Sequence, residues 1–411
     1  MGRLRKKMEE EINIVQAGFR QGRGTRDHIL NMLLIIEKCR EFNVNLFSCF
    51  VDYSKAFDCV QHQKLWEIMG NMGFPSHIVQ LIKTLYLDQQ AAVRIDGETS
   101  DWFNIKQGVR QGCVLSPYLF NLYAEDIMRT VRDDIIRDQY DALNIGGHEI
   151  PEIRYADDTV LLSTSQNGIE NLLTSTQRNS ENHNLFLNIA KTKIMHTDKT
   201  TMEGEIYVNE EILEVVENFE YLGSLITSNG DTLKEIKRRL SIALQKLKQL
   251  NKLWNGTDRS TKIRFLRAGI FPIATYACET WTLTKQAEQR INAFEYKCYR
   301  RVLRISWVKK RTNASILQEL NTEEGWLLKT IKRRKLIYFG HLKRHESLER
   351  TIMEGYMPGK RGRGRSKRRW VQEVADDLQM DVSDAGHLAC DRDVLRKVVV
   401  AARFCKGQAT E

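Results

Sequence analysis

Two adjacent aspartates interrupt a stretch of the chain that otherwise has the composition of a β-sheet. Residues 154–162 read RYADDTVLL, with Asp157 and Asp158 between two arms of apolar and β-branched residues. The arms have the pattern of two strands that pair as a tight hairpin, with Ala156, Asp157 and Asp158 at its turn. Adjacent carboxylates repel each other, and a shared hard divalent cation relieves that repulsion. Aspartate is also common in turns for local hydrogen-bonding reasons, so the pair alone leaves plain turn chemistry as an alternative.

A third aspartate ends an apolar segment earlier in the chain. Residues 45–52, NLFSCFVD, read as a buried strand that ends on Asp52. An ionised carboxylate cannot be buried alone, so this one must reach solvent, a cation or a partner. We therefore expect Asp52 at an edge of the sheet.

The remaining segments predict an α+β fold, because strands and helices alternate without a strict βαβ period. Helices are expected at 25–42, on both sides of the break GNMGFP within 63–86, and within 170–188. A hairpin is expected around Asp96 and Gly97, and further strands at KIMHT (193–197), EIYV (205–208) and FEYLGSLIT (219–227).

A strongly amphipathic helix is predicted from residue 232 onward. Thr232 followed by Glu235 has the spacing of a capping box. An apolar stripe runs along one side, and Lys and Arg cover the other faces, which suits a helix that docks on a core and meets phosphates. A basic face that only keeps the helix soluble is the alternative. The stripe consists of Leu233, Ile236, Leu240, Leu244, Leu247 and Leu250, and the basic residues include Lys234, Lys237 and Arg238.

The positive charge of the chain is concentrated near its C-terminus. The formal net charge is +10, yet residues 331–370 alone hold 14 Lys and Arg against 3 Glu. The basic run GKRGRGRSKRRW (359–370) is expected to bind phosphate, to address the nucleus, or to do both. Its basic residues are Lys360, Arg361, Arg363, Arg365, Lys367, Arg368 and Arg369.

Composition also limits the class of protein. The N-terminal MGRLRKKMEEE lacks the apolar core of a secretory signal, and the longest apolar run, ILNMLLII (29–36), is too short to cross a bilayer. The 8 cysteines include no CxxC pair, so ordinary reduced thiols are expected. The sequence therefore predicts an intracellular protein, in the nucleus or the cytoplasm, with no membrane partner; it sets no oligomeric state.

Several motifs occur together in a fixed order. They read FVDYSKAFDCVQH (50–62), QGVRQGCVLSPYLFN (107–121), RYADD (154–158), LFLNIAKTKIM (185–195) and FEYLGSLI (219–226). Together they resemble the palm motifs of reverse transcriptases, in wording typical of non-LTR (LINE-type) retrotransposons, and QAGFRQGRGTRDHI (16–29) resembles a fingers motif of that family. The resemblance covers roughly residues 5–310.

The resemblance implies a right-hand polymerase fold of the α+β class. The expected parts are partial fingers (1–42), a palm with inserted fingers elements (43–230), a helical thumb (231–310) and a basic, mainly helical C-terminal region (311–411). Members of the family carry a further fingers segment before the QAGF motif, and only 15 residues precede that motif here, so we expect an N-terminally truncated copy.

The resemblance also assigns catalytic roles. Asp52, Asp157 and Asp158 match the catalytic aspartates that hold two Mg²⁺ ions, which Mn²⁺ can replace, with the carbonyl of Tyr53 as a further ligand. Lys191, in the N-x-x-K-T pattern that starts at Asn188, matches the lysine proposed to protonate the leaving pyrophosphate. A solvated surface lysine is the alternative for Lys191.

Further positions match residues that bind substrates. Phe57 matches an aromatic gate that excludes a ribose hydroxyl, although a phenylalanine so near a strand end is more often core. Gln111 and Gly112 match a motif that lets the backbone approach the templating pair, although QGVRQG also reads as a plain loop. The remaining matches are three fingers arginines near the triphosphate or template and a primer grip, namely Arg20, Arg23 and Arg26, and Tyr221, Leu222 and Gly223.

These matches predict an RNA-directed DNA polymerase that uses an RNA template, a DNA primer and dNTPs. The alternative is a catalytically inactive, truncated remnant that still binds nucleic acid, because binding needs charge whereas catalysis also needs geometry. A metal-dependent nuclease built on the same carboxylates is disfavoured, since it would give the Phe57, QG and YLG motifs no role.

Overall fold

The computed structural model describes residues 2–138, 141–197, 202–208, 210–250, 257–320, 325–362 and 367–401. By their contacts these residues form two compact units. The first unit comprises Met1–His28, Phe42–Glu217 and Gly355–Arg361, and the second comprises Ile29–Glu41, Asn218–Glu354 and Gly362–Glu411. Among the described residues, no helix combines the length and apolar character needed to cross a membrane. The division into fingers, palm and thumb at residues 42, 230 and 310 stays a prediction.

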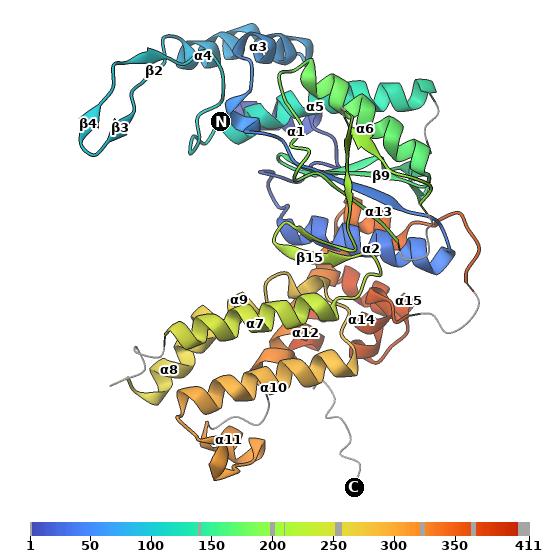
Figure 1. The fold of residues 1–411 in the computed structure, drawn as a ribbon. Coiled ribbons are helices and arrows are strands. Elements are labelled where there is room, and N and C mark those ends of the chain that lie inside the picture. The colour runs from blue at the N-terminus through green and yellow to red at the C-terminus, as the bar shows by residue number, and fades with distance from the viewer. Residues whose placement is uncertain are drawn as a thin grey trace. The chain divides into compact units, whose positions relative to one another are not determined.

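The first unit mixes helices and strands, which confirms the predicted α+β class. Its helices are α1 (Gly2–Glu11), η1 (Ala56–Asp58), α3 (His62–Asn71), α4 (Ser76–Tyr86), α5 (Ser116–Asp138) and α6 (Gln166–Glu181), together with the start of α2 (Thr25–Phe42). Its strands are β1 (Phe47–Val51), β2 (Gln90–Ala91), β3 (Arg94–Ile95), β4 (Glu98–Thr99), β5 (Phe103–Asn104), β6 (Asn144–Ile145), β7 (His148–Glu149), β8 (Glu152–Tyr155), β9 (Asp158–Ser163), β10 (Lys193–His196), β11 (Tyr207–Val208), β12 (Glu211–Ile212) and β13 (Glu214–Val215). The short strands β2 to β5 form an arm beyond α4 (Figure 1).

A five-stranded sheet forms the centre of the first unit, in the order β13-β10-β1-β9-β8. Strand β1 pairs antiparallel with both β9 and β10, and β9 pairs antiparallel with β8, as the hairpin pattern in the sequence predicts. Only the short edge strand β13 runs parallel to its neighbour β10. All five residues of β1 are buried. A central strand that is buried on both faces has a nearly continuous apolar sequence, and β1 has this pattern, interrupted only by the buried Ser48.

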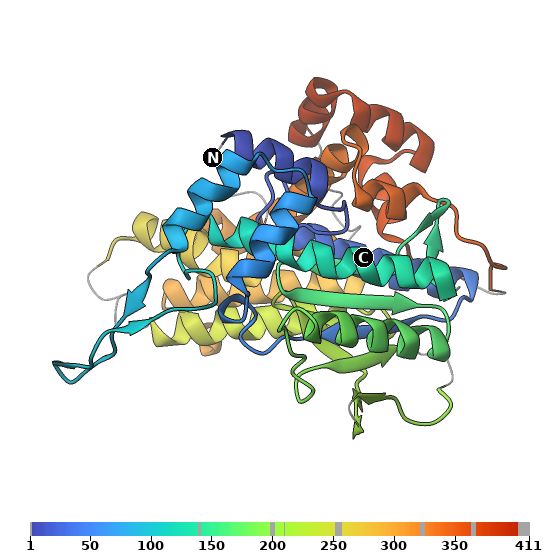
Figure 2. The ribbon, with the colours of Figure 1, turned by 90° about the horizontal axis from the view of Figure 1, so that it is seen from above.

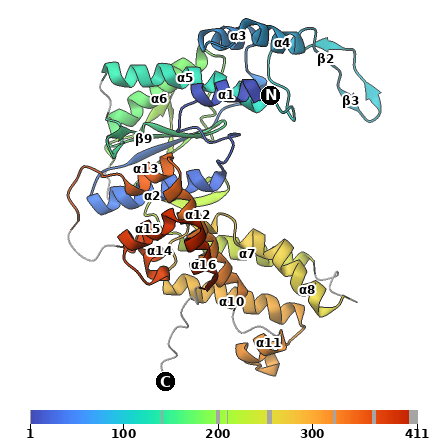
Figure 3. The same ribbon diagram turned by 180° about the vertical axis from the view of Figure 1, so that it is seen from behind.

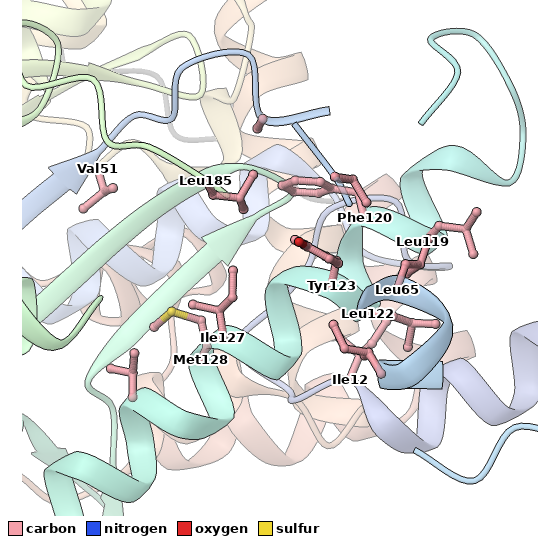
Figure 4. Packing of buried hydrophobic residues seen from close by; sticks show 14 of the residues in the cluster. Ile12, Val51, Leu65, Leu119, Phe120, Leu122, Tyr123, Ile127, Met128 and Leu185 are labelled. Atoms are coloured by element: carbon pink, nitrogen blue, oxygen red, sulfur yellow. The ribbon is translucent and has the colours of Figure 1, made fainter. Parts of the chain in front are cut away.

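Helices α5 and α6 pack side by side against one face of this sheet (Figure 2). Apolar side chains of α5, among them Phe120, Tyr123 and Met128, lie in one core with Val51 of β1 and Leu65 of α3 (Figure 4). Each such side chain contributes about 1.5–3 kcal/mol on burial. This core holds the end of β1 in place.

Beneath the hairpin of β8 and β9 lies a buried network of charges. Arg132 and Arg154 both pair with the carboxylate of Glu125 on α5, and Arg132 also pairs with Glu152 on β8 at 2.6 Å. The charges of the two arginines hold the pKa of Glu125 below its usual value although burial alone would raise it. Burial wins at the wholly enclosed Glu152, whose pKa is raised.

The second unit is almost entirely helical. Its two strands, β14 (Asn218–Tyr221) and β15 (Ser224–Thr227), form a hairpin. Its helices are the remainder of α2, α7 (Leu233–Gln249), α8 (Arg259–Phe265), the π-helical turn η3 (Leu266–Ile270), α9 (Phe271–Ala274), η4 (Cys278–Thr280), α10 (Lys285–Val302), η5 (Trp307–Lys309), α11 (Asn313–Glu319), α12 (Trp326–Arg344), α13 (Leu348–Glu354), α14 (Trp370–Leu378), α15 (Val382–Cys390) and α16 (Arg392–Ala401). Helix α12 packs against α10 and against the C-terminal helices α14, α15 and α16 (Figure 3).

Helix α7 confirms the predicted apolar stripe, but its N-terminus differs from the prediction. Thr232 makes no side-chain cap; its hydroxyl donates to the carbonyl of Thr282 instead. Asp231 accepts the N–H of Leu233 at 2.9 Å, and Glu235 accepts the N–H of Leu225. The capping box was therefore wrong, because neighbouring segments of the second unit use both side chains.

Most other predicted elements form near their expected positions. The helix expected within 170–188 ends earlier, at Glu181. Asn184 takes a left-handed conformation with φ 55°, and Leu187 then pairs with Tyr53 in an antiparallel bridge. Pairing with the segment after β1 therefore overrides the helical pattern there.

We predict that Glu125→Leu lowers the free energy of unfolding by about 3–5 kcal/mol, because it leaves the buried guanidinium of Arg154 with only the carboxylate of Glu152, 3.9 Å away. The measurement is the shift of the urea unfolding midpoint. Glu67→Leu on the exposed face of α3 is the control and should change stability by less than about 0.5 kcal/mol. Equal shifts for the two variants would contradict the role assigned to the network.

Candidate active site

The three predicted catalytic aspartates lie together at one end of the sheet. Val51 pairs with Thr159, so the next residues in register are Asp52 and Asp158. Tyr155 pairs with Asp158, which leaves Ala156 and Asp157 as the two central residues of the hairpin turn. The sheet register therefore brings residue 52 beside residues 157 and 158, about a hundred positions away in the chain.

The turn between β8 and β9 has an unusual backbone. Ala156 has φ 59°, whereas Asp157 is not among the residues with positive φ. A positive φ at the first central residue alone is the pattern of a type II′ hairpin turn, where glycine is usual. An alanine there is unfavourable by about 1–2 kcal/mol, so surrounding contacts must hold the turn.

The carboxylates disfavour one another's charge. Burial raises the pKa of Asp158 to about 6, and the charges of Asp157 and Asp52 add to the effect. Burial also raises the pKa of Asp157, with a further contribution from Asp52. Carboxylates that repel each other in this way are typical of sites that receive a cation.

The chemistry of these residues fits a hard divalent cation. All three offer carboxylate oxygens, and Oδ2 of Asp52 is buried without a hydrogen-bond partner. Two backbone bonds join the neighbouring segments: Asn188 donates to the carbonyl of Asp52, and Ser54 donates to that of Phe186. Neither bond uses the carbonyl of Tyr53.

The side chains do not converge fully, however. Over the described part of the chain, no three His, Cys, Asp or Glu side chains are placed as a group that would hold a metal ion. The backbone positions of Asp52, Asp157 and Asp158 match the predicted ligand set, but sharing a cation requires their side chains to rotate toward one another.

Lys191 lies next to Asp52. Its Nζ is 3.5 Å from Oδ2 of Asp52, and its side chain is 68% exposed. The turn that carries it is fixed because the N–H groups of Lys191 and Thr192 both donate to the carbonyl of Asn188. The lysine is thus an anchored but accessible cation beside the carboxylates.

Phe57 lies half-buried in the short helix η1, which follows β1. Its ring stacks on Phe120 at 4.6 Å between centroids, and Phe19 meets it edge-on at 6.5 Å. The ring packs against the core, but the side chain is only half-buried, so the core does not enclose it. Its role as a gate stays a prediction. The supporting role of Phe120 was not apparent from the sequence.

The QGVRQG loop runs alongside the same segment. Val109 donates to the carbonyl of Phe57, and Gly108 donates to that of Val60, both at 2.8 Å. A side chain on Gly108 would meet the backbone of Asp58 at 3.0 Å, so glycine is needed there. Gln111 and Gly112 are exposed, and nothing lies within 4 Å of the position a Cβ of Gly112 would take.

The three fingers arginines have different surroundings. Arg20 is buried, pairs with Glu9 at 2.7 Å and donates to the carbonyls of Asn13 and Gln16. Arg23 donates to a backbone carbonyl, and the exposed Arg26 lies 3.6 Å from the neighbouring Asp27. Arg20 therefore serves the fold in this structure, which does not present it as a substrate contact.

The predicted primer grip belongs to the second unit. Tyr221 is buried, and Leu222 and Gly223 form the turn of the β14–β15 hairpin with φ 48° and 75°. Arg238 donates to the carbonyl of Gly223, and Tyr276 donates to that of Leu222 at 2.8 Å.

The basic face of α7 is only partly available. Lys234 and Lys237 are exposed, and Lys234 donates to Asn218 at 3.1 Å. Arg238 pairs with both Glu220 and Glu235, so its charge is used inside the unit. The sequence could not separate paired from accessible cations.

The C-terminal basic residues also divide into two groups. Lys335 is buried in an ion pair with Glu373, and Arg368 pairs with Asp376 at 2.6 Å. Arg369 is half-buried, 3.9 Å from Glu41. Three further residues of the predicted set are exposed, namely Lys360, Arg361 and Lys367. Two others, Arg363 and Arg365, lie outside the described residues.

The QAG segment makes contacts that sequence reasoning missed. Gln16 and Gly18 lie against Ala156, at the turn that carries Asp157. The only signal for this in the sequence is a polar residue and a glycine in a motif close to buried apolar positions. Ala156 is 140 residues from Gln16 in the chain, a separation that no local pattern reveals.

The residues of the candidate site other than the C-terminal basic ones and those of α7 lie in a segment that matches a known family. Residues 2–226 match the family model described as reverse transcriptase (RNA-dependent DNA polymerase), which is more than half of the chain. The chain belongs to the reverse transcriptase family. Its α+β fold is accordingly that of a right-hand polymerase.

Relatives of known sequence include polymerases of non-LTR retrotransposons. The chain is 23% identical over 313 residues to the RNA-directed DNA polymerase from mobile element jockey of Drosophila melanogaster, covering 74% of this chain and 33% of that one. It is 29% identical over 164 residues to the Pol polyprotein of a type-2 retrotransposable element of the same species, covering 39% and 15%. A transposon-derived protein of Caenorhabditis elegans is 24% identical, covering 57% and 88%. The chain thus spans a third or less of the two Drosophila relatives.

Solved structures with some likeness include telomerases. Apo telomerase from Candida tropicalis aligns with a TM-score of 0.44 at 12% identity, covering 97% of this chain and 61% of that one. Telomerase from Candida albicans, in complex with a fragment of telomeric RNA, aligns with a TM-score of 0.41 at 12% identity, covering 81% and 55%.

We predict that Asp158→Asn stabilises the protein in the absence of divalent cations. The pKa of Asp158 is raised to about 6, so its ionised form disfavours the folded state. The gain in melting temperature should therefore be full above about pH 6 and vanish as the pH falls towards about 4. The measurement is thermal unfolding with a chelator across this range.

Asp133→Asn, on an exposed position of α5, is the matched control and should show no such pH dependence. Added Mg²⁺ should stabilise the unmutated protein more than Asp158→Asn. A melting temperature for Asp158→Asn that stays below that of the unmutated protein at every pH would contradict the repulsion.

Proposed function

We propose that this chain is an RNA-directed DNA polymerase of a non-LTR retrotransposon, which adds a nucleotide from a dNTP to a primer 3′-hydroxyl on an RNA template. The observation that supports this most is the register that places Asp52 beside Asp157 and Asp158. Family membership supports the reaction class, and the divalent metal that such enzymes use suits three carboxylates.

We further propose Mg²⁺ as the cation, in a pair, with Mn²⁺ as a substitute. When bound, the pair lowers the pKa of the primer hydroxyl and neutralises charge on the triphosphate. Asp52 contributes the buried oxygen that lacks a hydrogen-bond partner, and Asp157 and Asp158 contribute charges that are costly without a cation.

The other residues act on the substrates directly. Lys191 is exposed beside Asp52, where an ammonium group can stabilise or protonate a leaving pyrophosphate. Phe57, in η1 and backed by the stacked ring of Phe120, presents a rigid surface for the sugar of the incoming nucleotide. Gly112 leaves open space for the templating pair next to the exposed Gln111.

Nucleic acid is proposed to bind through the accessible cations. These include Lys234 and Lys237 on α7 and, in the C-terminal basic run, Lys360, Arg361 and Lys367. A nuclear or cytoplasmic location remains a proposal that rests on the same run. Phosphate contacts of this kind make binding depend on salt but do not select a sequence.

The decisive prediction concerns Asp157→Asn. The unmutated protein should extend a DNA primer on an RNA template with Mg²⁺ or Mn²⁺, and the variant should show no measurable extension, because it loses a metal-binding charge. The measurement is a primer-extension assay with labelled primer. Asp133→Asn is the control and should extend the primer normally.

The primer-extension assay, read beside a measurement of primer-template binding, separates the polymerase from the inactive remnant. An unmutated protein that binds the primer-template but extends nothing under either metal is the inactive remnant. Extension that survives in Asp157→Asn would contradict the proposed site.

A second prediction concerns sugar selection by Phe57. Phe57→Val removes the ring but keeps an apolar side chain on Phe120, so the variant should incorporate ribonucleotides more readily relative to deoxynucleotides. Losing the contact between the ring and the sugar should change the discrimination between the two nucleotides by about 1–3 kcal/mol, or roughly 10- to 200-fold in selectivity. The measurement is the ratio of kcat/KM for a matched dNTP and NTP. An unchanged ratio with intact activity would show that Phe57 is only a core residue.

A further inference from the structure

Ala156, the residue before the catalytic pair, is hydrogen-bonded by a side chain from outside the β8–β9 hairpin. The Gln16 side chain is fully buried and contacts both backbone groups of Ala156. Its Oε1 accepts the N–H of Ala156 at 2.9 Å, and its Nε2 donates to the carbonyl of Ala156 at 3.2 Å. The same Oε1 also accepts the N–H of Gly18 at 2.8 Å.

Gln16 is itself held at the edge of the sheet by backbone hydrogen bonds. Gln16 forms a parallel bridge with Arg154, in which Ala17 donates to the carbonyl of Arg154 and Arg154 donates to that of Val15, both at 2.9 Å. Residues 15–17 thus run beside the edge strand β8. The side-chain amide of Gln16 is therefore held in a fixed position relative to β8.

Close approach to the turn requires a glycine two residues later. A Cβ on Gly18 would lie 2.2 Å from the backbone nitrogen of Ala156. Asn121 of α5, which is buried, donates to the carbonyl of Gly18 at 2.8 Å and so fixes this residue from the other side. The 16–18 segment is held between α5 and the turn.

The hydrogen bonds from Gln16 stabilise Ala156 in an unfavourable conformation. Ala156 has φ 59°, which is unfavourable for any residue with a Cβ, and it is buried, so its polar backbone groups need partners. The Gln16 amide supplies both partners in the one geometry that this turn has. Asp157 comes directly after Ala156, so the direction of its side chain depends on that geometry.

We propose that Gln16 is a positioning residue: by binding both backbone groups of Ala156 it fixes the turn that presents Asp157 to the metal shared with Asp52. The inference rests on the proposed function for the identity of that metal site. Gln16 touches neither substrate nor metal and acts only through the turn.

The test compares Gln16→Met with a matched buried amide. Methionine keeps the length and volume of glutamine but makes none of its three hydrogen bonds. Asn179 of α6 is also buried and bonded, to Ser175 and Asp134, yet it makes no contact with the hairpin turn, so Asn179→Leu is the control. Thermal unfolding of both variants shows how much stability each has lost.

The main measurement is Mn²⁺ affinity, followed by the signal of the free ion. Gln16→Met should weaken the binding that depends on Asp157 about 10- to 100-fold, the usual effect of losing a group that orients a metal ligand. It should raise the Mg²⁺ concentration for half-maximal primer extension in parallel. Asn179→Leu should change neither, whatever stability it loses.

A rescue keeps the inference testable if Gln16→Met alone folds poorly. Glycine adopts positive φ freely, so Ala156→Gly removes the backbone strain that the hydrogen bonds from Gln16 offset. Adding Ala156→Gly to Gln16→Met should restore most of the Mn²⁺ affinity, whereas adding it to Asn179→Leu should restore nothing. A folded double variant that binds Mn²⁺ as weakly as a protein carrying Asp157→Asn would overturn the proposal.

The outcomes separate this inference from the proposed function. If the protein binds Mn²⁺ through Asp157 but extends no primer, the polymerase proposal fails, and the effect of Gln16→Met on affinity still decides the inference. If primer extension is normal and a folded Gln16→Met keeps both metal affinities, the inference fails and the function stands. No Asp157-dependent Mn²⁺ binding in the unmutated protein would overturn both.

Discussion

The antiparallel register of β1 and β9 is the constraint on which the rest of the site depends. Because backbone bonds pair Val51 with Thr159, the next residues along the two strands, Asp52 and Asp158, must lie beside each other. A slip of one residue would turn every side chain of β9 to the other face. The buried core under α5 and α6, which excludes such a slip, therefore also fixes the distance between acids that are far apart in the chain.

Around this register the protein combines a rigid base with an unfavourable turn. Glu125, Arg132 and Arg154 form a buried ionic network under the hairpin, while Ala156 is held in a left-handed conformation above it. Burial, together with the charges of Asp157 and Asp52, raises the pKa of Asp158 to about 6. Strain and like charges of this kind persist only where the surroundings enforce them, and they are common at functional sites. The network and the neighbouring core stabilise the fold and so offset the unfavourable turn.

The sequence predicted features that depend on local pattern. Periodicity and residue type predict the mainly apolar run of β1, the turn residues around Asp157 and the stripe of α7, and all three were found near their expected places. Long-range polar contacts were not predictable. Arg20 and Arg238 look like accessible cations in the sequence, yet both are paired within the fold, and Thr232 bonds to Thr282 rather than capping α7. The roles of Asp52, Asp157 and Lys191 came from family resemblance, and the register explains why such a spacing brings them together.

The central claim is that residues 52, 157 and 158 share bound cations when their side chains turn toward one another. Anomalous diffraction from crystals of the protein soaked in Mn²⁺ tests this most directly, because it locates the ion without relying on activity. The account predicts a peak in contact with carboxylate oxygens of both Asp52 and Asp157, absent from crystals of Asp157→Asn. Ordered Mn²⁺ found only elsewhere, with Asp52 still facing Lys191 alone, would contradict it.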